Sequence, residues 1–408
     1  MNQKNLQPVI LFVAVGLGII LGINLSPSTT QSMGLPGKLF IQVIKAIATP
    51  LLFFAIIDSF LTIQIRGKDL LKMFGISAIN AGFAIIVALT LCNFFKPGVF
   101  FDLKSFESIN SGVAPQTSLA SLFEKMIPTS FVSPFVENNI FSIVILAVLF
   151  GFAIRSVRKD HQELNSTFIQ IESIVRVCYR LLERILYWLT LLVPIAVLGI
   201  TAKAVSEKGL GIFVGLSSYL ALCVGGLLLQ MFIVYQGWIV FYVKMPLRKF
   251  WSHSKYAIIH AFGVNSSLAT LHLTLSATEK LGASPHASRI IACVGTNFNN
   301  DGILLYEAAA ALFISQALGY DLSFLQQLTV MATCIVAALG VSGVPEAGII
   351  SLAVVLSANG LPTEVLPLLL TVDWFVARLR SVTNVMSDIT GSLVLDHQTR
   401  GYKNVKAA

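Results

Sequence analysis

Apolar segments of about 20 residues recur along this chain, and their length constrains the fold more than any other feature. An α-helix of that length spans the hydrocarbon core of a bilayer, which is about 30 Å thick. Only 12% of the 408 residues are charged and 55% are hydrophobic, whereas soluble domains carry roughly 25% charged residues. The sequence therefore predicts an all-α polytopic membrane protein. The helices that we expect before residue 250 lie at 8–25, 38–64, 70–95, 136–157, 165–203 and 209–244.

The net charge of +8 has a simple explanation in such a chain. Lysine and arginine gather in loops between the apolar segments, and short basic loops of membrane proteins remain in the cytoplasm. No zinc-finger, RRM or homeodomain pattern is present, so we expect no nucleic-acid partner. The cysteines and histidines show no metal-ligand spacing, so no resident cofactor is expected. The basic loops place both termini in the cytoplasm and residues 96–135 outside, in a multi-pass protein of the inner (plasma) membrane.

The last third of the chain differs, because polar or glycine-rich clusters interrupt its apolar segments. Non-helical backbone at membrane depth is tolerated only where protein or a water-filled cavity satisfies it. The distribution of basic loops agrees with the span count only if residues 250–280 and 322–360 are re-entrant hairpins. Paired interrupted segments are typical of transporters with inverted repeats. The interrupting clusters are FGVNSSLAT (262–270), GTNFNNDG (295–302) and ALGVSGVPEAG (338–348).

A polar stripe follows in the closing segment. If this segment is helical, four polar residues fall on one face about 80° wide. Charged groups inside a membrane are costly, and they are retained for pairing, ion pathways or substrate contact. Arg380 can pair internally with an aspartate or hold a substrate carboxylate through two hydrogen bonds, and the sequence leaves both interpretations open. The residues of the stripe are Asp373, Arg380, Asn384 and Asp388.

The GTNFNNDG cluster indicates a cation site. Gly295 and Gly302 allow the helix to unwind, which frees backbone carbonyls, and the amide and carboxylate between them add side-chain oxygens. Unwound carbonyls coordinate Na⁺ in transporters. The alternative is a kinked helix with a hydrogen-bonded aspartate. The side chains concerned are those of Asn299 and Asp301.

The tips of the two expected hairpins differ in chemistry. Ser266 and Ser267 make the first tip polar, and they either cap two half-helices or offer N–H and hydroxyl groups to an anionic substrate. The second tip is rich in glycine between residues 340 and 348, which is typical of a flexible gate or of a plain turn.

Together these motifs resemble those of the dicarboxylate/amino acid:cation symporter family. Residues 299–303 are similar to the family's NMDGT motif, and residues 265–268 are similar to its serine-rich hairpin. Residues 343–348 are similar to its G-x-P-x-A-G hairpin, and residues 373–388 are similar to its last helix. The resemblance implies eight transmembrane helices plus two re-entrant hairpins, arranged as inverted repeats. It also implies a homotrimer in membrane lipid, working as an elevator-type transporter that couples Na⁺, or H⁺, to uptake of a small anionic substrate.

The site residues are likewise implied by the resemblance. Arg380 would bind a substrate carboxylate, and Asn384 with backbone groups of both hairpins would bind the other end. The substrate residues would be Ser266, Ser267, Val344, Gly348, Ala377, Arg380, Ser381 and Asn384. The Na⁺ ligands would be Gly295, Asn299, Asn384 and Asp388 for one ion, Asn297, Ala338, Leu339 and Val341 for a second beneath the gate, and Ser77, Asn80, Asn299 and Asp301 for a third.

One position separates the substrate classes. Family members that carry amino acids have an aspartate three residues before the arginine, where it pairs with the ammonium group, and here that position is Ala377. An ammonium group without that partner is poorly satisfied, which favours a C4-dicarboxylate. Asp388 is kept, however, as in the amino-acid carriers, so an acidic amino acid such as glutamate or aspartate remains an equal expectation. A symporter of neutral amino acids and an anion channel on the same fold are the alternatives.

The motifs that other classes of protein would need are absent from the sequence. No enzyme is expected, because no GxSxG, HExxH or paired catalytic aspartate lies on a span, and the lack of a Walker A motif disfavours an ATP-driven pump.

The resemblance also divides the chain into domains. The expected parts are scaffold helices 1–2 (1–69), transport-domain helix 3 (70–95), an extracellular loop (96–135), scaffold helices 4–5 (136–208), the remaining transport domain (209–396) and a cytoplasmic tail (397–408).

Overall fold

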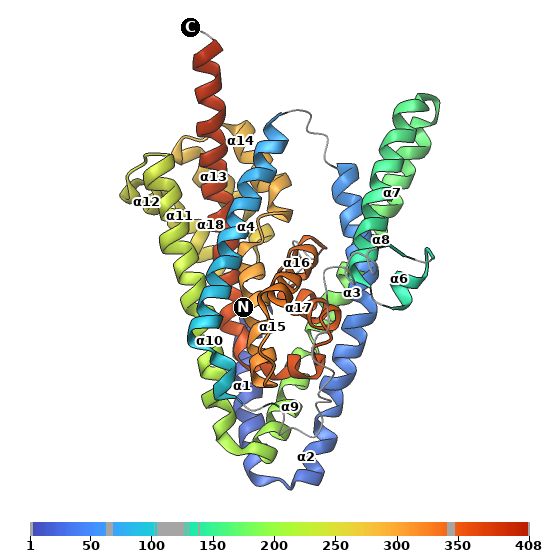
Figure 1. Cartoon of the computed structure of the whole chain (residues 1–408), viewed down its shortest axis with the longest axis vertical. Coiled ribbons are helices and arrows are strands. Elements are labelled where there is room, and N and C mark those ends of the chain that lie inside the picture. The colour runs from blue at the N-terminus through green and yellow to red at the C-terminus, as the bar shows by residue number, and fades with distance from the viewer. Residues whose placement is uncertain are drawn as a thin grey trace. The chain divides into compact units, whose positions relative to one another are not determined.

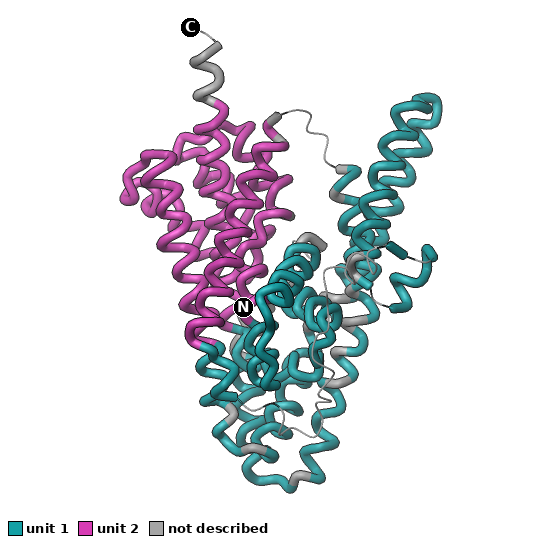
Figure 2. Tube along the Cα trace, in the orientation of Figure 1, with its two compact units in different colours: residues 1–64, 96–219, 310–374 teal, residues 65–95, 220–309, 375–408 magenta. Residues whose placement is uncertain are grey.

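The chain is built of helices that gather into two compact units (Figures 1 and 2). Every regular element in the described residues is helical, which confirms the all-α prediction. Unit 1 comprises residues 1–64, 96–219 and 310–374, and unit 2 comprises residues 65–95, 220–309 and 375–408. The computed structural model describes residues 3–62, 68–101, 103, 127–128, 130–137, 139–340 and 347–406.

Unit 1 packs its helices in sequence-distant pairs. The first helix lies along α9, and α3 packs against α7, α8 and α9. Two further helices, α16 and α17, pack against each other and against α3. The helices of this unit are α1 (Gln3–Asn24), α2 (Pro27–Met33), α3 (Leu35–Thr62), α6 (Ser133–Val136), α7 (Ile140–Asp160), α8 (Asn165–Thr190), α9 (Val193–Lys208), α16 (Phe324–Gly340) and α17 (Ala347–Ala358), with short turns η1 (Pro97–Phe100), η2 (Gln162–Leu164), η3 (Gly209–Gly211) and η8 (Thr363–Val365).

One predicted helix proves to be two. The sequence indicated a single helix over 165–203, but α8 ends at Thr190 and α9 begins at Val193. Pro194 lies in the first turn of α9. A proline inside a continuous helix would remove one backbone hydrogen bond and clash with the preceding turn, whereas the first turn tolerates it. The other segments predicted before residue 250 each coincide with a helix or with one continuous helical run.

Unit 2 carries the interrupted segments. It contains α4 (Lys68–Phe95), a helical run with two π turns, the first hairpin, and the part of the closing helix from residue 375 onward. Two helices, α10 (Ile212–Leu229) and α15 (Asp301–Ala317), contribute to both units, as does α18 (Leu366–Lys406). The remaining elements of unit 2 are η4 (Gln230–Val234), α11 (Tyr235–Gly237), η5 (Trp238–Tyr242), α12 (Leu247–Val264), α13 (Ser267–Leu281), α14 (Pro285–Arg289), η6 (Ile290–Val294) and η7 (Gly295–Asn297).

Both expected hairpins are pairs of packed helices. In the first, α12 ends at Val264, and the next residue, Asn265, adopts a left-handed conformation with φ of 50°. The second helix of the pair, α13, begins directly after Ser266. Asparagine tolerates this conformation better than most residues, so it can end a helix in place of glycine. In the second, α16 and α17 flank residues 341–346, which lie outside the described residues. The expected division into scaffold and transport domains concerns movement, and it stays a prediction.

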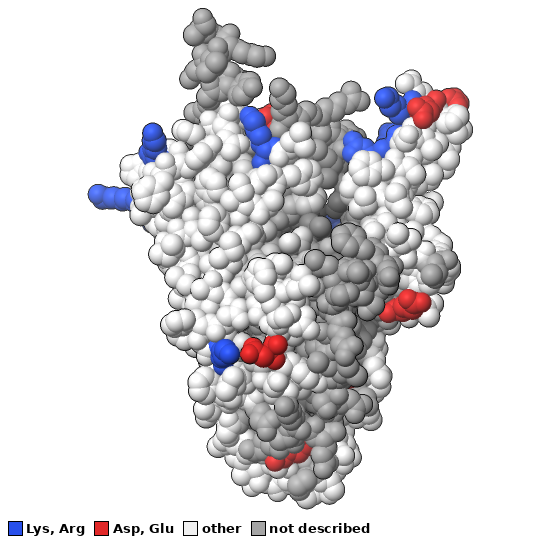
Figure 3. Space-filling model, viewed as in Figure 1, with Lys and Arg blue, Asp and Glu red and all other residues white. Residues whose placement is uncertain are grey.

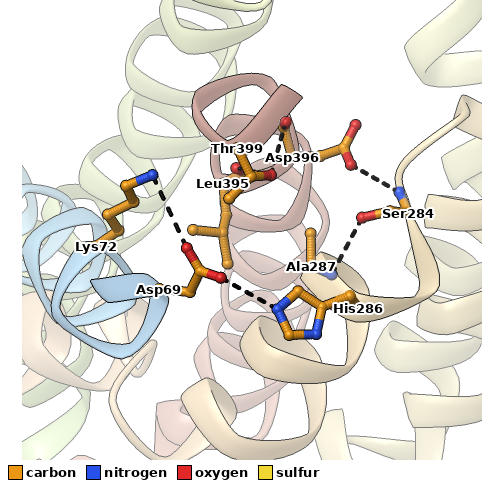
Figure 4. A network of polar contacts seen from close by, with 8 residues as sticks. All are labelled: Asp69, Lys72, Ser284, His286, Ala287, Leu395, Asp396 and Thr399. Atoms are coloured by element: carbon orange, nitrogen blue, oxygen red, sulfur yellow. Dashed lines mark hydrogen bonds and ion pairs between the residues drawn. The ribbon is translucent and has the colours of Figure 1, made fainter. Parts of the chain in front are cut away.

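A buried apolar cluster joins α4, the segment around α14 and α18 within unit 2. Its members include Met73, Ile76, Ile291 and Leu395, each at most 3% exposed. Near this cluster, the Asp69 carboxylate lies 3.2 Å from the ring nitrogen Nε2 of His286 (Figure 4). The Asp396 carboxylate accepts a hydrogen bond from the Ser284 N–H group at 2.9 Å. These contacts fix the ends of the three segments and leave their middle parts to form the site. The full cluster is Met73, Ile76, Ala287, Ile290, Ile291, Val394 and Leu395.

The surface matches an apolar environment. Among the described residues, charged side chains are sparse on the face of the molecule in Figure 3. In the described residues, Leu71–Phe95 and Gly209–Tyr242 are long and apolar enough to cross a membrane. Shorter apolar helical stretches lie at Phe12–Asn24, Thr49–Asp58, Phe324–Ala338 and Gly348–Ala358.

Candidate functional site

The helix is broken where the GTNFNNDG cluster lies, as the sequence predicts. A π turn (η6) and a 3-10 turn (η7) follow α14, and regular α-helix resumes only at Asp301. The Gly295 carbonyl accepts hydrogen bonds from the N–H groups of Phe298 at 2.7 Å and Asn299 at 2.9 Å. The break therefore presents polar groups to the helices on either side, α4 and α18.

Asp388 lies at the centre of the first polar cluster. Its carboxylate, 2% exposed, accepts hydrogen bonds from the Asn299 amide at 3.1 Å and from the Thr296 hydroxyl at 3.1 Å. The Asn299 side-chain oxygen in turn accepts from the Ser77 hydroxyl at 2.5 Å. Ser77 belongs to α4 and Asp388 to α18, so the break links both helices. A buried carboxylate beside neutral amide and hydroxyl groups has the kinds of oxygen atom that bind alkali cations.

Asp301 forms a second cluster on the same segment. Its side chain is fully buried, and one oxygen, Oδ2, accepts hydrogen bonds from Ser387 at 2.7 Å and from Tyr235 at 2.8 Å. The other oxygen, Oδ1, is buried and has no hydrogen-bond donor within the described part of the chain. A buried carboxylate oxygen without a donor is costly, and it is able to contact a cation.

Arg380 is buried beside an aromatic ring. Its side chain is 3% exposed, and the guanidinium carbon lies 3.9 Å from the centre of the Tyr306 ring. A cation over an aromatic face is stabilised electrostatically, more strongly when both groups are desolvated. In such stacking the N–H donors point along the edge of the guanidinium plane, which is the direction in which arginine binds carboxylates. Ala377, also on α18, is 2% exposed.

The tip of the first hairpin contacts α18 at the predicted pocket. The Ser381 hydroxyl donates to the side-chain oxygen of Asn265 at 2.9 Å. Ser266 caps α13, because its hydroxyl accepts the Ala269 N–H group at 3.1 Å. Capping, one of the two roles left open by the sequence, is thus the one seen for Ser266. Ser267 follows as the first residue of α13 and is half-buried.

Asn384 connects the break to the closing helix. Its side-chain oxygen accepts the Gly302 N–H group at 2.9 Å, and its amide lies 3.4 Å from the Asn300 side-chain oxygen. Gly302 permits this approach, since a Cβ there would lie 2.7 Å from the Arg380 carbonyl oxygen.

Unit 2 thus gathers most of the predicted residues, although not all. Asn80 is buried at the second cluster, where its amide lies 3.4 Å from the Ser387 hydroxyl. Asp373 is buried but belongs to unit 1. Residues Ala338, Leu339 and Gly348 also belong to unit 1, while Val341, Val344 and the side chain of Asn297 lie outside the described residues. The part that these residues play in the site stays a prediction.

Several site residues were missed from the sequence. Tyr235 lies in a long apolar segment where a tyrosine usually indicates packing, and Tyr306 follows the quoted motif without belonging to it. Thr296 stands inside the GTNFNNDG cluster and was overlooked beside its amides and carboxylate. The available signal was the concentration of glutamine, tyrosine and tryptophan at 230–238, which is unusual in an apolar helix.

These features define the class of protein. An apolar, all-helical chain with a broken helix, buried carboxylates and a buried arginine has the groups of a membrane transporter rather than of a soluble enzyme. The profile of the sodium:dicarboxylate symporter family matches residues 8–398, so the chain belongs to that family and is an integral membrane protein. Members of the family are transporters and not enzymes.

Similar proteins include carriers of three kinds. Excitatory amino acid transporter 1 of Mus musculus is 33% identical over 301 residues, 72% of this chain and 53% of the relative. The C4-dicarboxylate transport protein of Solibacter usitatus is 28% identical over 398 residues, 94% of this chain and 90% of the relative. The neutral amino acid transporter B(0) of Oryctolagus cuniculus is 26% identical over 450 residues, which cover 97% of this chain and 80% of the relative. The match spans about half the length of the excitatory amino acid transporters.

Proposed function

We propose that this protein is a secondary active symporter that couples Na⁺ to the uptake of a small dicarboxylate-type anion. The observation that carries the proposal is the buried Arg380, stacked on Tyr306 in the same compact unit as Asp301 and Asp388. A guanidinium held in this way can bind a carboxylate bidentately. Two buried carboxylates need cations to offset their desolvation. One unit therefore offers one place for an anion and two for cations.

Coupling follows from the cost of moving these charges. Without cations, two buried carboxylates would enter the low-dielectric membrane interior with little compensation. A bound anion would add an opposite charge beside the buried guanidinium, which already stacks on the Tyr306 ring. The free-energy cost of moving the unit through the membrane is therefore lower when it carries both the cations and the anionic substrate. The cost is also lower when the unit has rearranged in the absence of both, and it is higher when the unit is only partly loaded. H⁺ is the other ion that could supply this compensation.

The proposed cation ligands follow the observed clusters. Asp388 would bind one Na⁺ with carbonyl oxygens of Gly295, Asn299 and Asn384, and Asp301 would bind another with oxygens of Asn299 and Ser77. Support comes from the contacts of Asp388 and from the buried Asp301 Oδ1. The proposed ligands of a further Na⁺ beneath the second hairpin are Asn297, Ala338, Leu339 and Val341.

The proposed substrate groups surround Arg380. Ser381 and Asn384 would line the pocket, and their contacts with the first hairpin tip and with the helix break support this. The small, buried Ala377 leaves no carboxylate for an ammonium group at its position, which supports a C4-dicarboxylate over an acidic amino acid. The other residues proposed for substrate contact are Ser266, Ser267, Val344 and Gly348.

The wider mechanism is part of the proposal. Residues 70–95 and 209–396 would move as the transport domain against a scaffold of residues 1–69 and 136–208. We propose a homotrimer in the inner membrane, with both termini in the cytoplasm. Membership in the family, whose profile spans nearly the whole chain, supports these assignments.

The test is uptake by purified protein in proteoliposomes. Succinate, aspartate and alanine are compared under an inward Na⁺ gradient and under a pH gradient alone. We expect Na⁺-driven uptake of a dianionic substrate that Arg380→Ala abolishes. Arg176→Ala is the control, because Arg176 is a half-exposed arginine of α8 that pairs with Asp58 of α3 and lies outside the candidate site. Undiminished uptake in Arg380→Ala, or preferred uptake of alanine, contradicts the assignment.

A further inference from the structure

Three polar side chains of one helical run reach the Asp301 cluster. The run is η4–α11–η5, and its residues Gln230, Tyr235 and Trp238 each contact the cluster or its neighbour Asn80. The Tyr235 hydroxyl donates to Asp301 Oδ2 at 2.8 Å, and the Trp238 indole N–H donates to Asn80 Oδ1 at 2.9 Å. The Gln230 amide donates to the Asn80 backbone carbonyl at 3.3 Å. These residues belong to no motif in the sequence, and they come from a helix not expected to contribute to the site.

The π turns explain how this helix presents these side chains together. In an α-helix, residues five apart lie about 140° from each other around the axis. In η4 the Tyr235 N–H group instead bonds to the Gln230 carbonyl, five residues back. A turn closed in this way places residues i and i+5 close to one face, and such bulges are frequent at functional sites. Trp238 then begins the second π turn, η5.

The resulting hydrogen bonds run in one direction toward Asp301. Trp238 occupies the side-chain oxygen of Asn80, whose amide lies 3.4 Å from the Ser387 hydroxyl. Ser387 donates to the same Asp301 oxygen as Tyr235 does. Oδ2 therefore receives two donors, whereas Oδ1 receives none within the described residues. The side-chain oxygen of Asn80, a residue expected from the resemblance to bind the cation, is held in place by the Trp238 indole N–H group.

We infer that Tyr235 and Trp238 are positioning residues, which hold the Asp301 carboxylate in one orientation with Oδ1 alone facing the coupling cation. Asn80 joins this layer through its contacts with Trp238 and Ser387. The inference rests on the proposed Na⁺ symport. A carboxylate fixed in place leaves a cavity of one size, and cations that do not match this size bind less well. Tyr235 and Trp238 therefore set both the affinity for Na⁺ and the preference for Na⁺ over Li⁺.

The experiment uses the full chain in proteoliposomes, with Na⁺ and Li⁺ as the cations. Uptake of the transported anion is measured against cation concentration in the parent, Tyr235→Phe and Trp238→Phe. Tyr256→Phe is the control, since Tyr256 is an exposed tyrosine on α12. We expect the half-saturating Na⁺ concentration to rise three- to tenfold in both variants, and the Na⁺/Li⁺ preference to fall. The maximal rate should change less than the half-saturating concentration does.

The outcomes separate this inference from the proposed function. A variant that merely folds less well lowers the maximal rate and leaves the half-saturating Na⁺ concentration unchanged. An unchanged Na⁺ titration in both variants, with Asp301→Asn still abolishing Na⁺ dependence, overturns the inference and leaves the symport intact. Uptake by the parent protein that ignores Na⁺ refutes the proposed function, and this inference with it. Should Tyr235→Phe aggregate, the Trp238→Phe titration decides alone.

Discussion

Replacement of Gly302 by alanine tests the closest backbone contact in the site. A Cβ at this position would lie 2.7 Å from the Arg380 carbonyl oxygen, 2.9 Å from the Arg380 Cα and 3.1 Å from the Asn384 side-chain oxygen. Two of these atoms belong to the backbone of α18 and cannot rotate away. The start of α15 must therefore shift away from α18.

The cost of that shift has two parts. Overpacking of a buried contact costs about 1–3 kcal/mol. The shift also strains the hydrogen bond from the Gly302 N–H group to Asn384, now 2.9 Å long, whose loss costs about 1 kcal/mol. Together they reach about 2–4 kcal/mol, which lowers the melting temperature of a chain of 408 residues by roughly 2–5 °C. Because Arg380 and Asp301 flank the contact, we also expect substrate binding to weaken.

The assay compares thermal unfolding of Gly302→Ala in detergent with its uptake in proteoliposomes. Gly82→Ala on α4 is the matched control, since a Cβ there meets nothing within 4 Å. Alanine in an open helical position should be neutral or stabilising by about 0.5–1 kcal/mol. If Gly302→Ala unfolds at the same temperature as Gly82→Ala and transports as well, the reasoning from the close approach is wrong.

Two further substitutions test the roles assigned on α18. Ala377→Asp should raise the ratio of aspartate to succinate uptake at least tenfold, since it supplies a carboxylate for the ammonium group. The control, Ala377→Asn, is similar in size but uncharged and should leave the ratio unchanged. Equal ratios in the two variants would show that Ala377 is not the selectivity position. Asp388→Asn should raise the half-saturating Na⁺ concentration at least tenfold, equivalent to about 1.4 kcal/mol of lost binding, because it removes the buried charge. Asp396→Asn is its control on the same helix, because that carboxylate accepts the Ser284 N–H group and was not assigned to a cation site. An identical Na⁺ titration for both variants would exclude Asp388 as a ligand.

The sequence predicted the residues of the broken helix and of the polar stripe, but not their partners. Asn299, Asp301 and Asp388 stand out locally, because polar groups in apolar segments are costly and few. The resemblance placed Ser77, Asn299 and Asp388 among the Na⁺ ligands. The hydrogen bonds by which Asn299 bridges the other two came only from the structure, since Ser77 is 222 residues away in the chain. The single helix expected over 165–203 failed for a local reason, the proline at 194, which its apolar surroundings obscured.

What the sequence determined by itself is the membrane class, the helical breaks and the family motifs, because each depends on composition or spacing within one segment. The tertiary structure alone decided which oxygen of Asp301 is covered, that Tyr306 lies under Arg380, and that α11 takes part at all. Those contacts depend on helices far apart in sequence and on two π turns that rotate side chains onto a common face. Periodicity along a single helix carries no record of either.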